Sequence, residues 1–167
     1  MSSSCSHAPV AVTASQEYTA KAWAVLKQRG LRQTEPRKQI IDALAELLGP
    51  TSAYDLRDML LERHKKADIV TIYRVLECLE ANGLVHRLLT RPGGVVRCQL
   101  PSEDECHHAE SSHHCHHVLV CQCCNGVQEL HCPGVGPLIA YAEKESGYTV
   151  QTHYLEFAGL CPQCSTL

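Results

Sequence analysis

Several features that would assign this chain to a common functional class are missing. No run of about 18 apolar residues occurs, so a membrane-spanning helix is not expected. The first fifteen residues, MSSSCSHAPVAVTAS, have neither the basic residues nor the apolar length of a secretory signal, which favours a cytoplasmic protein. The HExxH pattern of zinc proteases is absent, and Leu160 stands where a deaminase CxxC motif has proline. We therefore expect no enzymatic activity and no small-molecule substrate.

The chain also has little net charge, but the charge it has is unevenly distributed. The formal net charge is -3. Residues 1–91 hold 13 Lys and Arg against 10 Asp and Glu (+3), and residues 92–167 hold 2 against 8 (-6). This asymmetry suggests a first half that meets a polyanion and a second half that gathers cations.

Cysteine and histidine are abundant by contrast. The 11 cysteines are an odd number, so they cannot all pair in intrachain disulfides. They occur as CxxC pairs beside histidines, and the densest ligand run extends from Cys98 to Cys124. Thiolate and imidazole bind zinc, copper or iron in preference to magnesium or calcium. The sequence therefore predicts a metalloprotein, with zinc as the favoured metal.

Two CxxC pairs form the strongest single motif. Cys121 and Cys124 make one pair, and Cys161 and Cys164 make the other. The two-residue spacing lets both thiolates face one ion, and two such pairs complete a tetrahedral four-sulfur zinc site. A site of this kind has no position for water, so its function is structural. Cys123 is an alternative ligand in the first pair, although the spacing favours Cys124.

The periodicity of the first half predicts helices followed by a hairpin. Thr34 and Ser52 are predicted helix N-caps, and the segment ending at Asn82-Gly83 carries an apolar stripe opposite Thr71 and Arg74. Helices followed by LVHRLL and VVRCQL are typical of a winged helix-turn-helix, although a purely structural unit would show the same pattern. The expected ranges are a disordered arm at 1–15, helices at 18–30, 34–49, 52–64 and 67–83, a winged-helix domain at 16–91, and a wing and hinge at 92–101.

The second half, residues 102–167, predicts a small α/β domain. Two strands around a cysteine-bearing knuckle, a helix at 137–147 and a strand at 148–159 give an α+β fold for the whole chain. A second, mixed metal site is suggested by His86, Cys98, the 113–117 cluster and Glu129. Because these ligands come from both sides of the hinge, an ion would bind only when the domains hold one relative position, as a sensor requires.

These residues carry a resemblance to a known family. Six segments that follow one another over residues 18–164 resemble the ferric uptake regulator family of metal-responsive bacterial repressors. They are LRQTEPRKQIIDAL, SAYDLRDML, TIYRVLECLEANGLVHR, the histidine cluster, CQCCNGVQEL and HYLEFAGLCPQC. Within it, SAYDL, LVHR and Cys98 are most similar to the zinc uptake regulator branch. The resemblance implies a homodimer with an N-terminal winged helix and a C-terminal dimerisation domain.

The resemblance also implies the role of each site residue. Structural zinc is expected at Cys121, Cys124, Cys161 and Cys164, and regulatory zinc at His86, Cys98, His114 and Glu129, giving at least two Zn2+ per protomer. DNA contacts are expected from Tyr54, Thr71, Tyr73 and Arg74. His116 is an alternative to His114, and an alternative or third site is expected among His113, His116, His117 and His153. Cys106, His107 and His108 lie in an unusual insertion and are candidates for an additional site.

The implied function is a zinc-responsive transcriptional repressor of zinc uptake genes, with zinc as co-repressor and an inverted-repeat DNA operator as its partner. An iron- or peroxide-sensing regulator of the same family is the nearest alternative. A zinc-buffering protein would leave the winged helix unexplained.

Overall fold

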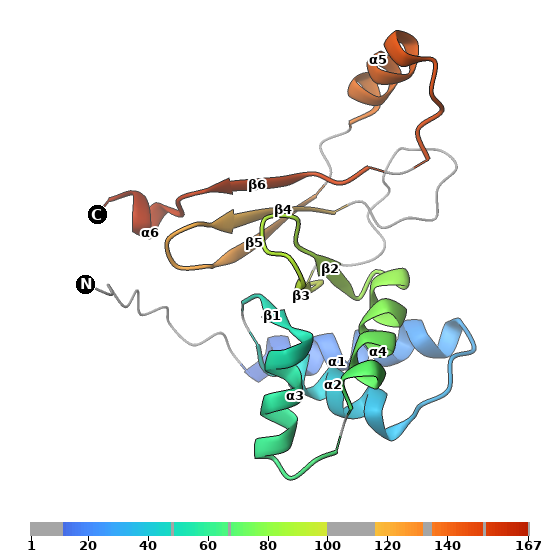
Figure 1. The fold of residues 1–167 in the computed structure, drawn as a ribbon, viewed down its shortest axis with the longest axis vertical. Helices are drawn as coiled ribbons and strands as arrows, with labels where there is room; N and C mark the ends of the chain where they lie inside the picture. The colour runs from blue at the N-terminus through green and yellow to red at the C-terminus, as the bar shows by residue number, and fades with distance from the viewer. Residues whose placement is uncertain are drawn as a thin grey trace.

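In the computed structural model, the described residues are 12–47, 49–66, 68–99, 116–131, 135–151 and 153–166. The N-terminal unit is helical, with a small three-stranded sheet of order β1-β3-β2 at one side (Figure 1). Both sheet pairings are antiparallel, and Val95 of the central strand lies opposite both Thr51 and Arg87. The elements are α1 (Val12–Gln28), α2 (Glu35–Glu46), β1 (Thr51–Ser52), α3 (Ala53–Glu62), α4 (Ile69–Ala81), β2 (Val85–Arg87) and β3 (Gly94–Arg97).

One apolar core holds this unit together. The helical stripes predicted from the sequence supply it, with Ile40, Leu56 and Ile72 each fully buried. Tyr18 of α1 is also buried, and its hydroxyl donates a hydrogen bond of 3.1 Å to the carbonyl of Leu84 beside β2. The winged helix-turn-helix predicted from helical periodicity is confirmed as the architecture of this half.

Three details of the first half differ from the prediction. Helix α1 begins at Val12, inside the range expected to be a disordered arm, because neither Gly nor Pro interrupts residues 12–28. Thr34 occupies the N-cap position of α2, but its side chain makes no capping hydrogen bond to the described backbone. The two-residue strand β1 was not predicted, since only its pairing with β3 identifies it.

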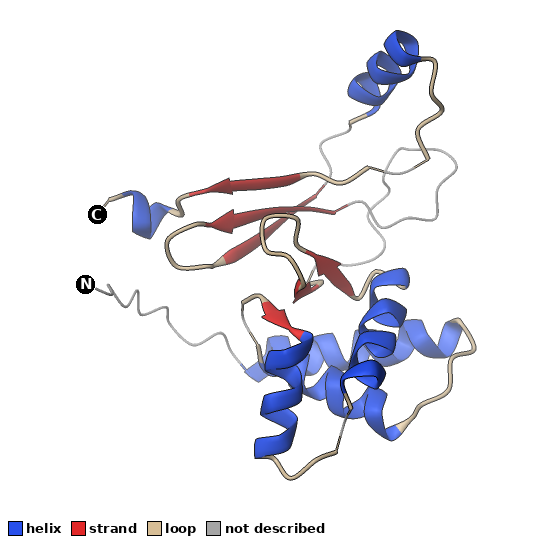
Figure 2. Cartoon of the chain, viewed as in Figure 1, coloured by secondary structure: helices blue, strands red, loops and turns tan. Residues whose placement is uncertain are grey.

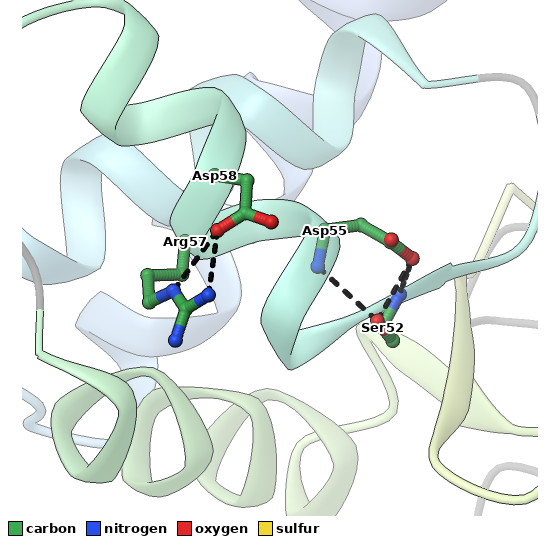
Figure 3. Close-up of polar contacts among 4 residues, drawn as sticks. All are labelled: Ser52, Asp55, Arg57 and Asp58. Atoms are coloured by element: carbon green, nitrogen blue, oxygen red, sulfur yellow. Dashed lines mark hydrogen bonds and ion pairs between the residues drawn. The ribbon is translucent and has the colours of Figure 1, made fainter.

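Helix α3 begins at a complete capping box (Figure 3). The amide of Asp55 donates to the Ser52 hydroxyl oxygen at 3.2 Å, and the amide of Ser52 donates to the Asp55 carboxylate at 2.8 Å. The two side chains thus satisfy two backbone groups that the first helical turn leaves without partners. Serine at this position therefore fixes where α3 starts.

We expect Ser52→Ala to lower the free energy of unfolding by about 1 kcal/mol, because it removes the capping oxygen. Urea unfolding monitored by circular dichroism measures this change. Thr34→Ala is the matched control, since Thr34 is also an N-cap residue but its side chain makes no capping hydrogen bond to the described backbone. Equal losses for the two variants would contradict the assignment.

The wing consists of β2, β3 and the turn between them. Gly93 adopts φ +75°, and a Cβ at Gly94 would lie 2.9 Å from the carbonyl oxygen of Arg91, so both turn glycines are required by the backbone. Strand β3 lies within the range expected to form the wing and hinge, 92–101, and it pairs with both β1 and β2.

The C-terminal half contains a second three-stranded sheet and one helix that stands away from it (Figure 2). Strands β4 (His116–Cys121) and β5 (Val127–His131) form an antiparallel hairpin. Strand β6 (Glu156–Gly159) joins β4 in parallel on its other side, reached through helix α5 (Gly136–Ser146), and the short helix α6 (Pro162–Ser165) follows it. The predicted α/β organisation of this half is confirmed.

The strand predicted over residues 148–159 is wrong for most of its length. Only Glu156–Gly159 pairs with β4, opposite Val118 to Cys121. Tyr148 and Tyr154 alternate as a strand would but are 77% and 72% exposed, and α5 buries none of its described side chains.

In the described part of the chain, no helix combines the length and apolar character needed to cross a membrane.

Candidate metal centres and nucleic-acid interface

The four cysteines of the two CxxC pairs come together in the structure. Cys121 ends β4, Cys124 follows in the knuckle, Cys161 is the N-cap residue of α6, and Cys164 lies within α6. Their sulfur atoms all lie within 4.8 Å of one another, and the sulfurs of Cys124 and Cys161 are 3.8 Å apart. A tetrahedral zinc–sulfur site with bonds of about 2.3 Å requires sulfur separations of about 3.8 Å. The group therefore fits one zinc ion.

Backbone amides around this group favour thiolates, which is the form that binds metal. The pKa of Cys121 falls to about 6, because the backbone N–H groups of Cys124 and Cys161 point at its sulfur. The amide of Cys161 lies 3.3 Å from that sulfur. Gly126 donates similarly to Cys124 at 3.4 Å, but burial and the neighbouring Cys121 sulfur leave the pKa of Cys124 raised. One thiolate is thus present at neutral pH before any metal binds.

A second group spans the joint between the halves of the chain. The ligand atoms of His86, Cys98 and Glu129 lie within 4.8 Å of one another. His86 belongs to β2, Cys98 follows β3, and Glu129 belongs to β5. Imidazole, thiolate and carboxylate together form a donor set that suits zinc. Three ligands leave one tetrahedral position for a further residue.

Two cationic side chains, Lys21 and Arg97, also lie near Cys98. The Lys21 ammonium nitrogen lies 3.4 Å from its sulfur, and Cys98 itself is fully buried. Beside it, Arg97 is only 3% exposed, its guanidinium lies 5.7 Å from the centre of the Tyr18 ring, and burial lowers its pKa. Lys21 was not anticipated from the sequence, because the contact joins residues 77 positions apart. Lys21 thus links α1 to the cysteine of the second ligand group.

The remaining predicted ligands are only partly described. His117 is 1% exposed, and its ring centre lies 5.7 Å from that of His153. Burial and the neighbouring His153 lower the pKa of His117, which favours the neutral, metal-binding imidazole. The other expected ligands lie outside the described residues or have undescribed side chains, and they are Cys106, His107, His108, His113, His114 and His116.

The predicted DNA-facing residues lie on α3 and α4. Tyr54 is 54% exposed, and the Arg57 guanidinium lies 5.2 Å from its ring centre (Figure 3 shows Arg57 paired with Asp58). Arg74 is exposed and Tyr73 is 37% exposed on the outer face of α4. These three side chains are accessible to a partner. An exposed helix carrying arginine and tyrosine can enter a major groove.

Thr71 differs from its neighbours because its hydroxyl already has a partner. Asp68 is the N-cap residue of α4, and its carboxylate accepts hydrogen bonds from the amides of Val70 and Thr71 and from the Thr71 hydroxyl. These bonds, that of the hydroxyl first, lower the pKa of Asp68. Asp68 thus fixes the start of α4. Asp68 was not predicted from the sequence as the N-cap residue, although its position directly before the apolar stripe of α4 indicates that role.

Comparison with known proteins gives a consistent result. A family model described as "Ferric uptake regulator family" matches residues 28–158. The zinc uptake regulation protein of Escherichia coli K12 is 29% identical over 152 residues, covering 91% of this chain and 84% of that protein. The ferric uptake regulation protein of Neisseria gonorrhoeae is 34% identical over 142 residues, covering 84% and 91%.

The fold is similar to that of a solved zinc uptake regulator. The structure of a zinc uptake regulator complexed with zinc and DNA has a TM-score of 0.76 and 29% identity, and the match covers 91% of this chain and 95% of that one. The alignment therefore spans both halves of the molecule.

Proposed function

This chain belongs to the ferric uptake regulator family, and from this premise we propose that it represses zinc uptake genes with zinc as co-repressor. It is a zinc-responsive DNA-binding regulator, as its likeness to zinc uptake regulation proteins and to a zinc- and DNA-bound regulator indicates. Members of the family are transcription regulators, and a function of this kind needs no active site. Because the partner is chromosomal DNA, we place the protein in the cytoplasm.

We assign one structural and one regulatory zinc to each protomer. Cys121, Cys124, Cys161 and Cys164 hold the structural ion, which is supported by their sulfur separations. His86, Cys98 and Glu129 hold the regulatory ion, with His114 as the fourth ligand. A third site remains assigned to His117 and His153, together with a residue of the 113–116 cluster.

The single observation that carries the proposal is the position of the regulatory group. His86 and Cys98 come from the wing, whereas Glu129 comes from the C-terminal sheet. A zinc ion bound by all three stabilises the arrangement in which the wing docks on that sheet, and it cannot bind all three when the halves separate. Zinc therefore selects one orientation of the DNA-binding unit relative to its partner in the homodimer.

The homodimer supplies the second half of the DNA-binding surface. Exposed apolar side chains of α5, of β6 and of the residue after β6 support an interface on the C-terminal half; they are Leu138, Tyr141, Phe157 and Leu160. With two copies related by a twofold axis, two α4 helices meet successive major grooves of an inverted repeat. Lysine and arginine contacts to phosphate position the dimer, and α4 reads the bases.

The iron-sensing alternative is favoured by one observation, the 34% identity to a ferric uptake regulation protein. Cys98 argues against it. A buried thiolate suits zinc, whereas an iron(II) sensor is expected to use nitrogen and oxygen ligands.

The test is DNA binding at controlled free metal. An operator is first selected from a random-sequence duplex library in the presence of zinc. Anisotropy of that duplex is then measured while free zinc is buffered from the picomolar to the femtomolar range, and in parallel with iron(II) or manganese(II). Binding that rises steeply with zinc supports the proposal. Binding that ignores zinc, or that appears only with iron(II), overturns the zinc assignment.

We expect Arg74→Ala to weaken operator binding by about 30-fold or more at saturating zinc, because a base-contacting arginine contributes about 1–3 kcal/mol per half-site and the homodimer loses one from each half-site. Zinc content should not change, since Arg74 lies on the exposed face of α4 outside both ligand groups. Lys144→Ala, which removes the same charge from α5, is the control and should bind DNA as the wild type does. Equal losses would indicate a nonspecific charge effect.

A further inference from the structure

The wing turn contacts the C-terminal sheet through one carboxylate. Glu156, the first residue of β6, accepts a hydrogen bond of 2.5 Å from the amide of Leu89 and one of 3.2 Å from the amide of Thr90. The Thr90 hydroxyl donates to the same carboxylate. Three donors from two successive wing residues thus converge on a side chain 66 and 67 positions away.

Strand register places Glu156 in a row with the regulatory ligand Glu129. Val118 of β4 is paired with Glu129 of β5 on one side and with Glu156 of β6 on the other. Laterally paired residues of a sheet project from the same face. We call Glu129, Val118 and Glu156 the sheet row.

All three residues of the sheet row meet the wing. Val118 packs in a buried apolar cluster with Leu88 and Val96, which flank the wing turn. Glu129 accepts a hydrogen bond of 2.8 Å from the amide of Gln99, next to Cys98. Glu156 holds the turn itself at the other end of the row. One end of the row belongs to the metal group, whereas Glu156 lies outside both groups of candidate metal ligands found among the described residues.

On this basis, and resting on the proposed function, we propose that Glu156 is a positioning residue that sets the free-zinc concentration at which the protein responds. Its three hydrogen bonds exist only when the wing is docked on the sheet, as do the contacts of the regulatory ligands. Before zinc binds, Glu156 raises the population of the docked state. Because zinc binds that state, its apparent affinity rises in proportion to that population.

The experiment compares wild type with Glu156→Ala in the full-length, structurally zinc-loaded protein. Regulatory zinc affinity is measured by competition with a chelator, and operator binding is measured against free zinc. We expect the zinc affinity of Glu156→Ala to fall about tenfold, because several hydrogen bonds to one partly exposed carboxylate are lost. Zinc in the four-cysteine group should remain, and operator affinity at saturating zinc should stay within about twofold of wild type.

Two further variants separate this mechanism from a general loss of structure. Thr90→Val removes only the hydroxyl donor and should lower zinc affinity by about two- to threefold. In the double variant with Glu156→Ala it should cause no further loss of zinc affinity, because its hydrogen-bond partner is already absent. Glu62→Ala removes the same charge from the exposed end of α3, away from the wing, both ligand groups and α5, and should leave regulatory zinc affinity as in the wild type.

Two results would overturn the inference in a wild-type protein that responds to zinc. One is an unchanged zinc affinity in Glu156→Ala, and the other is weak operator binding by this variant at every zinc concentration. A wild-type protein that ignores zinc would instead contradict the proposed function. Amide hydrogen exchange at Leu89 and Thr90 would then still report whether Glu156 holds the wing, since both amides should exchange faster in Glu156→Ala.

Discussion

Cys161→Ser is expected to lose the structural zinc and to unfold the C-terminal half of the chain while the N-terminal unit stays folded. The substitution removes one of four sulfurs whose separations match a tetrahedral site. Serine oxygen binds zinc poorly, so the remaining three thiolates would hold the ion weakly. Cys161 also donates its amide to the Cys121 sulfur, which ties α6 to the end of β4.

The size of this effect follows from how little apolar core the C-terminal sheet has among the residues that the structure describes. Its buried cluster contains Leu88, Val96, Val118 and Val120, whereas eighteen residues form the core of the helical unit. Zinc binding to structural sites releases about 10–16 kcal/mol in small peptides, which rivals the whole stability of a typical domain, about 5–15 kcal/mol. The ion is therefore the main stabiliser of the sheet.

Three measurements check this prediction. Native mass spectrometry counts bound zinc, and amide exchange in β4 reports the sheet. Fluorescence of Trp23, the one tryptophan of the chain, reports the helical unit against whose core it packs. Cys123→Ser is the control, because Cys123 is exposed and lies outside the four-sulfur group. A Cys161→Ser protein with full zinc content and a protected β4 would contradict the structural assignment.

Signals that act over a few residues made much of this molecule predictable from its sequence. Ser52 was identified as a cap from its position directly before the apolar residues of the next helix, and its partner Asp55 lies only three residues away. The spacing of Cys161 and Cys164 places both thiolates beside one ion, and the apolar stripe of α4 identified its buried face. Each of these features depends on one element and its own geometry.

Features that depend on contacts between distant segments were not predictable in the same way. Alternation over residues 148–159 indicated a long strand, but a strand is defined by its pairing, and only Glu156–Gly159 pairs with β4. The contacts of Lys21 with Cys98 and of Glu156 with Leu89 join residues far apart in the chain, and no local pattern marks either one. Thr71 was expected to face DNA, yet Asp68 engages its hydroxyl.

The second large effect is expected from Cys98→Ser, which should lower regulatory zinc affinity by more than about 100-fold. Loss of supporting residues around a metal costs about 10- to 100-fold, and loss of a ligand costs more. Serine preserves the side-chain size in this fully buried position and can still accept from Lys21. The packing of the wing should therefore survive while the thiolate is lost.

Chelator competition and operator binding at buffered zinc measure this change in Cys98→Ser. Zinc in the four-cysteine group should be retained, and operator binding should require correspondingly higher free zinc. Cys78→Ser is the matched control, since Cys78 is a half-buried cysteine of α4 that contacts Arg37 and lies outside both ligand groups. Wild-type zinc affinity in Cys98→Ser would remove Cys98 from the regulatory site.

Cys98 and Glu156 act on different factors of the same response, and this difference can be measured. Cys98 sets the intrinsic affinity of the docked state for zinc, whereas Glu156 sets how much of the protein is docked before zinc arrives. Apparent affinity is the product of the two, so the fold-losses of Cys98→Ser and Glu156→Ala should multiply in the double variant. A double variant no weaker than Cys98→Ser alone would mean that Glu156 acts through the Cys98 ligand itself rather than through the docking of the wing.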